Sequence, residues 1–197
     1  ASSFDQIGPI ANNVYDAALV LEVISGHDSN DSTSSKRIVP VYSKLNAPSE
    51  KMKIAYMSEC IEHRGLDKKI KEKFLKKVND LQNKGHVVEP VSFSYLDYLV
   101  PTYYVLSTAE ASSNLSRFDG INYGYRAENS ESLEETYINT RTQGFGDEVK
   151  RRIMLGTFVL SAGYHDAYFT KAQKIRRIIK ENVEEIFSNY DFILSPT

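Results

Sequence analysis

"MKIAYMSECIEHRGLDKKIKEKFLKKVNDLQNKGHVVEPVSF", residues 52–93, is the stretch that decides the fold class. It begins with a short β-type run at 52–59 and ends with a second one at 86–93. Between them, residues 66–84 repeat apolar side chains at helical spacing, and Gly85 stands where a left-handed C-terminal cap is expected. A strand, a helix and a strand with short links predict a parallel crossover unit, and therefore an α/β fold.

Further helices are predicted on both sides of this unit. The apolar spacing of residues 14–24 predicts a helix with one buried face, capped by Asn12 or Asn13. Pro101 suits a first helical turn, so a helix is predicted from Pro101 to about Gly120. The other predicted elements are one short helix within 121–146, helices over 147–161 and 164–187, and a strand within 190–197.

Composition restricts the class of protein. With 197 residues, 41% hydrophobic and 25% charged, the chain is predicted to form one globular domain. The formal net charge of -2 gives no overall attraction to nucleic acid. A single cysteine, Cys60, excludes an internal disulfide and favours a reducing, cytoplasmic location. The apolar runs are too short for a membrane helix, so we expect a soluble protein with no membrane partner.

Motifs for bound cofactors are missing from the sequence. It contains neither the phosphate-binding pattern GxxxxGK[ST] nor the dinucleotide pattern GxGxxG. Cys60 lies near His63, but a nucleophilic Cys-His pair is defined by spatial geometry, so a structural cysteine is the favoured interpretation. We predict no metal site, because the four histidines lie far apart without metal-ligand spacing: His27, His63, His86 and His165.

Two stretches carry candidate binding residues. In "GFGDEVKRRIMLGTF", residues 144–158, two glycines precede a helix that carries basic residues in its first two turns. An arginine there could bind a carboxylate through its planar fork, or could instead pair with Asp147 or Glu148 on the surface. The lysine-rich face of helix 66–84 could contact nucleic acid, although such faces are more often only solvated.

Four long stretches, in this order, resemble the amidase signature family, and within it the A subunits of glutamyl-tRNA(Gln) amidotransferases. They are residues 1–34, the block around "EASSNLSRFDG" at 110–120, the stretch from "GFGDEVKRRIMLGTF" to residue 180, and "YDFILSPT" at 190–197. The resemblance implies a mixed β-sheet flanked by helices in αβα layers, with residues 1–197 as a middle to C-terminal fragment of one domain.

The resemblance also implies a function. Such subunits hydrolyse glutamine to supply ammonia for converting Glu-tRNA(Gln) to Gln-tRNA(Gln), using a nucleophilic Ser, a second Ser and a Lys. No residue of this chain matches those motifs, so no catalytic residue is assigned, and the 197 residues alone are expected to be inactive. Tyr103 and Arg152 are expected to bind glutamine, with Tyr104 or Arg151 as the alternatives if the register slips by one.

Partners follow from the same resemblance. Amidotransferase subunits B and C are expected to complete a heterotrimer, with some apolar surface of this chain exposed for contact, and Glu-tRNA(Gln) is reached only through the B subunit. No cofactor is expected in this chain, because ATP and Mg²⁺ are used by the partner protein. The alternative is another amidase-signature hydrolase that acts on small amides without tRNA.

Overall fold

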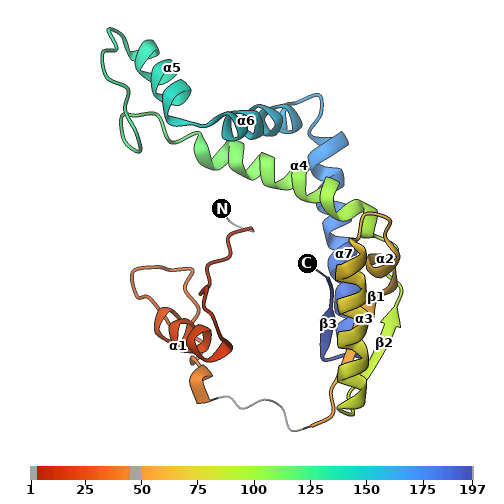
Figure 1. The fold of residues 1–197 in the computed structure, drawn as a ribbon. Helices are drawn as coiled ribbons and strands as arrows, with labels where there is room; N and C mark the ends of the chain where they lie inside the picture. The colour runs from red at the N-terminus through yellow and green to blue at the C-terminus, as the bar shows by residue number, and fades with distance from the viewer. Residues whose placement is uncertain (1–3, 45–49, 197) are drawn as a thin grey trace. The chain divides into compact units, whose positions relative to one another are not determined.

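A computed structural model describes residues 4–44 and 50–196 of the chain. The chain forms two compact units, Ser2–Glu50 and Lys51–Thr197. The larger unit is built on a three-stranded sheet of β1 (Lys53–Met57), β2 (Val87–Val91) and β3 (Phe192–Leu194) in the order β2-β1-β3. Both pairings are parallel, with Ile54 opposite Val88 and Phe192. The α/β class is therefore confirmed (Figure 1).

The crossover between β1 and β2 is formed by α2 (Ser58–Glu62) and α3 (Lys68–Asn83). The carboxylate of Asp67 caps α3 by accepting from the backbone N–H groups of Lys69 and Ile70. Gly85 follows the helix with φ of +89°, as its capping position requires. The predicted strand 52–59 begins one residue too early and ends two residues too late, because α2 begins at Ser58.

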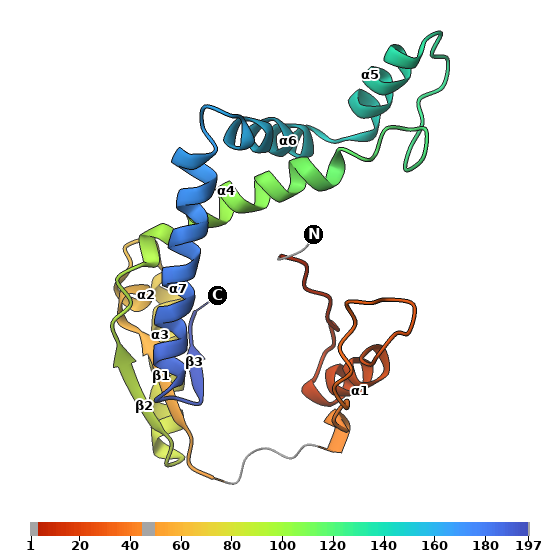
Figure 2. The ribbon, with the colours of Figure 1, turned by 180° about the vertical axis from the view of Figure 1, so that it is seen from behind.

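The main core lies between α3 and one face of the sheet. Phe74 and Val78 of α3 pack against Ile54 and Val88, and the ring of Tyr56 meets the ring of Phe74 edge-on, with centroids 5.7 Å apart. Since side chains alternate along a strand, the fully buried Ala55 belongs to the opposite face. Helix α7 (Lys171–Phe187) is seen on that side when the molecule is viewed from behind (Figure 2).

The predicted start of the next helix is wrong. Helix α4 runs from Leu96 to Leu115, so Pro101 lies inside it instead of at its first turn, and the helix ends before Gly120. Proline lacks the N–H that would bond to the carbonyl four residues earlier. Here that carbonyl belongs to Asp97, which is exposed near the helix start, so water can satisfy it.

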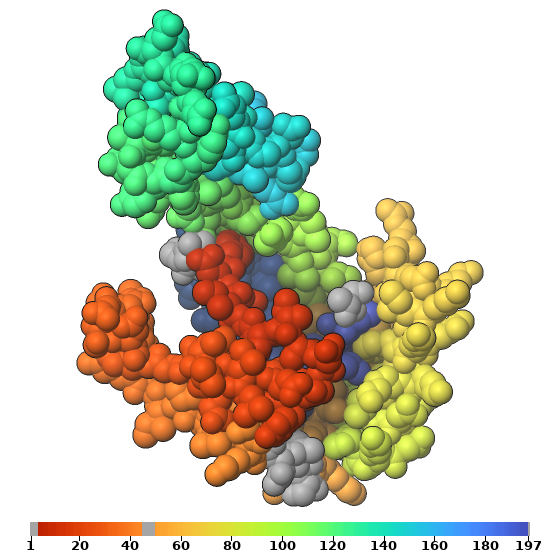
Figure 3. Space-filling model, turned by 60° about the vertical axis from the view of Figure 1, so that its left-hand side comes forward, coloured from red at the N-terminus to blue at the C-terminus, as the bar shows by residue number. Residues whose placement is uncertain are grey.

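The second half of the larger unit is helical. Helix α5 (Leu133–Gly144) is the short helix predicted within 121–146, and residues 116–146 form a projecting lobe, seen in green at the top of Figure 3. Helix α6 (Asp147–Leu160) runs back along α4, and a π-helical turn, Asp166–Thr170, leads into α7. The last predicted helix therefore begins with a π-turn.

The smaller unit contains α1 (Val14–Ile24) and a 3-10 turn at Tyr42–Lys44. Asn13 is the N-cap, since its side chain accepts from the N–H of Asp16. The prediction that one face of this helix is buried is wrong for the described residues, because no residue of α1 is buried and Val14 is 86% exposed. A single helix with one short turn supplies too little surface to cover that face.

Candidate functional site

The sequence-predicted binding residues come from two packed helices, α4 and α6. A glycine allows the close approach of these helices. A Cβ built on Gly156 of α6 would lie 2.6 Å from the Cβ of Ser112 and would overlap the backbone carbonyl of Thr108. The hydroxyls of Ser112 and Thr157 are hydrogen bonded at 2.9 Å across the same contact. Sequence reasoning missed Gly156, because a glycine inside a helical pattern does not reveal what it packs against.

This packing brings Tyr103, Tyr104 and Arg152 together. The guanidinium carbon of Arg152 lies 5.6 Å from the centre of the Tyr104 ring, over its face. The guanidinium also hydrogen bonds to the hydroxyl of Tyr103, and the two tyrosine rings meet edge-on with centroids 5.7 Å apart. Residues that are about fifty positions apart in the sequence therefore share one surface cluster.

The carboxylate of Glu148, one turn before Arg152, completes the cluster. Its Oε1 accepts from Nε of Arg152 at 3.0 Å, and its Oε2 accepts from the guanidinium of Arg151. The hydrogen bonds from Glu148 and then from Tyr103 raise the pKa of Arg152 above its usual value, so the guanidinium is always cationic. Arg152 thus forms the surface ion pair with Glu148 that the sequence allowed, and it also faces the tyrosines of α4.

The two arginines differ in their surroundings. Arg151 is 73% exposed and its described ion pair is with Glu148, whereas Arg152 is 32% exposed and contacts both tyrosines. Of these two arginines, Arg152 is the one that lies against the tyrosines. Tyr103 contacts its guanidinium through the hydroxyl and Tyr104 through the ring face, so both tyrosines belong to the cluster.

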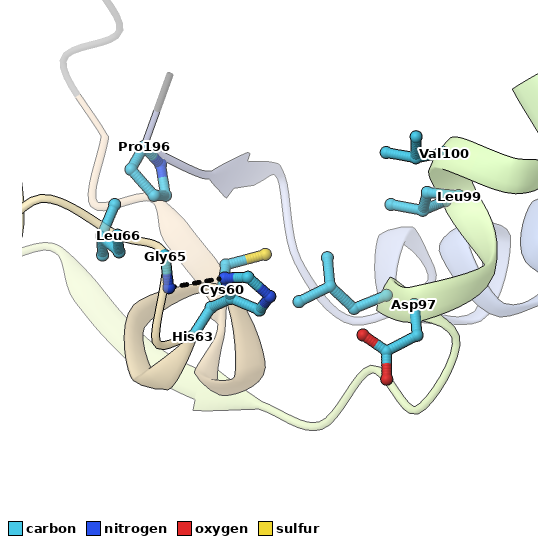
Figure 4. Close-up of a pocket in the computed structure, with 9 residues that line it drawn as sticks. Cys60, His63, Gly65, Leu66, Asp97, Leu99, Val100 and Pro196 are labelled. Atoms are coloured by element: carbon cyan, nitrogen blue, oxygen red, sulfur yellow. Dashed lines mark hydrogen bonds between the residues drawn. The ribbon is translucent and has the colours of Figure 1, made fainter.

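A separate cavity of about 470 Å³ lies where β1 and β3 end (Figure 4). Cys60 and His63 border it after β1, and the first turns of α4 border it with Leu99 and Val100. Nδ1 of His63 accepts from the N–H of Gly65 at 3.1 Å, and burial, followed by the nearby Glu59, raises the pKa of the Cys60 thiol. A thiol held in its neutral form is a poor nucleophile, which agrees with a structural cysteine.

The described part of the chain offers neither a metal-binding cluster nor a membrane helix. Across residues 4–44 and 50–196, no three side chains of the His, Cys, Asp or Glu type gather in a way that could hold a metal ion. In the same ranges, every helix is too short or too polar to cross a bilayer.

Comparisons with known proteins match the whole chain. The Amidase family model covers residues 1–197. The A subunit of glutamyl-tRNA(Gln) amidotransferase from Streptococcus mutans is 52% identical over 197 residues, which are 100% of this chain and 40% of the relative. The protein of the same name from Halothermothrix orenii is 50% identical over 207 residues, covering 100% of this chain and 41% of the relative. The chain thus spans about two fifths of the length of these relatives.

Solved structures give the same result. The A subunit of glutamyl-tRNA(Gln) amidotransferase from Thermotoga maritima superimposes with a TM-score of 0.68 at 41% identity, over 98% of this chain and 37% of that one. A bacterial aryl acylamidase of the amidase signature family superimposes with a TM-score of 0.69 at 16% identity, over 96% of this chain and 37% of that one, which shows a shared fold. With a family model that spans every residue and relatives at half identity, this chain belongs to the Amidase family.

Proposed function

We propose that this chain is part of the A subunit of a glutamyl-tRNA(Gln) amidotransferase, and that it supplies the residues that bind the α-carboxylate of glutamine. The relatives at 50% and 52% identity carry that name. The observation that carries the binding role is the cluster in which Arg152 contacts the hydroxyl of Tyr103 and the ring of Tyr104.

The geometry suits a carboxylate. Nε of Arg152 is engaged by Glu148, and the two terminal nitrogens carry four further N–H donors, more than Tyr103 alone can accept. A carboxylate can accept two parallel hydrogen bonds from a guanidinium, which gives both strength and a defined orientation. A phenol that accepts from the guanidinium keeps its own O–H proton for donation, so Tyr103 would fix the orientation of the bound carboxylate.

The reacting groups would lie outside this chain. The nucleophilic serine, the second serine and the lysine would belong to the part of the relatives that this chain does not span, so the 197 residues alone would release no ammonia. Amidotransferase subunits B and C would complete a cytoplasmic heterotrimer. The B subunit would use ATP and Mg²⁺ to activate Glu-tRNA(Gln), and ammonia from glutamine would be passed to it.

The test measures glutamine hydrolysis by the full-length protein assembled with its partner subunits. Arg152→Ala should raise the KM for glutamine about 10- to 100-fold, because charge-assisted hydrogen bonds to the carboxylate are lost. Arg151→Ala is the matched control, since it removes a neighbouring positive charge that also pairs with Glu148, and it should change KM less than about threefold.

A second substrate separates carboxylate binding from general damage. Glutamine α-methyl ester lacks the anionic carboxylate, so Arg152→Ala should change its KM much less than it changes the KM for glutamine. Equal effects of Arg152→Ala and Arg151→Ala on glutamine, or equal effects of Arg152→Ala on the two substrates, would refute the assignment.

A further inference from the structure

Arg152 lies on the partly open surface between α4 and α6, where its long side chain needs a restraint. An arginine side chain carries about 2 kcal/mol of rotamer entropy, and an exposed one samples many directions. Two of the groups that surround it, Tyr103 and Tyr104, belong to α4, and the third, Glu148, belongs to its own helix. These contacts together determine where the guanidinium points.

The contact with Glu148 differs in kind from the contact with Tyr104. Nε is the nitrogen nearest the aliphatic stem, and its bond to Oε1 of Glu148 at 3.0 Å fixes the plane of the guanidinium from the stem side. The contact with Tyr104 is with the face of the ring, which tolerates rotation of the guanidinium within its plane. Glu148 therefore restrains the guanidinium at Nε, while the hydroxyl of Tyr103 accepts a second hydrogen bond from it, and the two together set the direction in which the remaining N–H donors point.

We propose that Glu148 is a positioning residue for carboxylate binding, acting through Arg152 and not touching the substrate. This inference rests on the proposed function, because it concerns the same site. Glu148 holds Nε, Tyr104 supports the guanidinium face, and the terminal nitrogens stay aligned for a bidentate contact. Loss of Glu148 would leave the charge of Arg152 in place but would release its orientation.

The charge of Glu148 has an opposing effect. Glu148 is itself an anion, so it repels a bound carboxylate, and removing it would by charge alone tighten glutamine binding. The carboxylates of Glu148 and of bound glutamine would be separated by the width of a guanidinium. At that distance, in water, their repulsion lowers the affinity for glutamine about two- to threefold, and salt weakens the repulsion further. Positioning and repulsion therefore predict opposite signs for the change in KM, which makes the proposal testable.

The experiment uses the full-length protein with its partner subunits and measures KM and kcat for glutamine. Glu148→Ala should raise KM about fivefold with kcat changed less than twofold, because the lost hydrogen bond affects binding and not the reacting groups. Glu148→Gln should bring KM back to the parent value or up to about threefold below it, since its amide oxygen still accepts from Nε while the repelling charge is gone. With glutamine α-methyl ester the effect of Glu148→Ala should disappear.

Matched controls separate this role from a general contribution to helix stability. Glu181→Ala removes an ion pair of the same kind on α7, where Oε1 of Glu181 accepts from Nε of Arg177 at 2.7 Å, and it should leave KM unchanged. In the presence of Arg152→Ala, Glu148→Ala should add no further increase in KM, because the group it positions is gone.

The possible results are distinguishable. If Arg152→Ala leaves KM unchanged, the proposed function of this cluster fails and the role of Glu148 fails with it. If Arg152→Ala raises KM while Glu148→Ala leaves it unchanged or lowers it, carboxylate binding stands and the positioning role of Glu148 is overturned.

Discussion

Replacement of Gly156 by alanine should destabilise the larger unit, although alanine is the better helix former. The built Cβ would lie 2.6 Å from the Cβ of Ser112 and would overlap the carbonyl of Thr108. Carbon atoms in contact normally lie about 3.5 to 4.0 Å apart, so α4 and α6 would have to separate by about 1 Å. A backbone carbonyl cannot rotate out of the way as a flexible side chain can.

The net effect is the difference between two terms. Alanine in place of glycine gains about 1 kcal/mol of helix propensity. Overpacking of a tight contact costs about 1 to 3 kcal/mol, and the upper end applies here because backbone is involved and Thr108 is fully buried. We expect a net loss of about 2 kcal/mol in the free energy of unfolding.

Urea unfolding followed by far-ultraviolet circular dichroism measures this loss. Gly163→Ala is the control, because a Cβ at Gly163 meets no atom within 4 Å, and it should change the free energy of unfolding by less than about 1 kcal/mol. A Gly156→Ala variant as stable as the parent chain, or equal losses of stability in the two variants, would contradict this expectation. In the full-length protein Gly156→Ala should also raise the KM for glutamine, since Arg152 lies one turn away on α6.

Two further predictions concern the ends of β1 and β2. A hydrogen bond from Ser92, with support from the N–H of Phe93, lowers the pKa of Glu59 below its ordinary value of 4.5. The ionised Glu59 carboxylate therefore stabilises the fold above pH 4.5, and this stabilisation is lost as the pH falls through the lowered pKa. The urea midpoint of Ser92→Ala should therefore lie below that of the parent at pH 6, and the difference should shrink below about pH 4; a difference independent of pH would contradict this. Cys60, the only cysteine, should react with iodoacetamide at pH 8 at least several-fold more slowly in the folded chain than in urea, because burial raises the pKa of its thiol, and equal rates would show that it is accessible as thiolate.

Local signals in the sequence were sufficient for much of the fold. The strand, helix and strand of residues 52–93 were predicted correctly in type and order, though without α2, because apolar periodicity, the helix boundary at Gly85 and the short links all concern neighbouring residues. The start of α4 was predicted wrongly. Proline prefers a first helical turn, but this preference is weak, and tertiary packing extends the helix back to Leu96, before Pro101. The helix α1 itself was predicted correctly from its apolar spacing. The burial of its apolar face was not, since burial depends on whether another element packs against that face.

From the residues alone, the sequence predicted an arginine near the start of helix 147–161 that could bind a carboxylate. Tyr103 and Arg152 were named through the resemblance to the amidase signature family, with a possible slip of one residue, and the spacing of Glu148 and Arg152 already allowed an ion pair along one helix face. The folded chain was needed to establish that Arg152, and not Arg151, meets the tyrosines, and that Gly156 permits this contact. The physical reason is that helical spacing fixes which side chains share a face, whereas the neighbour of that face depends on how closely two helices distant in sequence can pack.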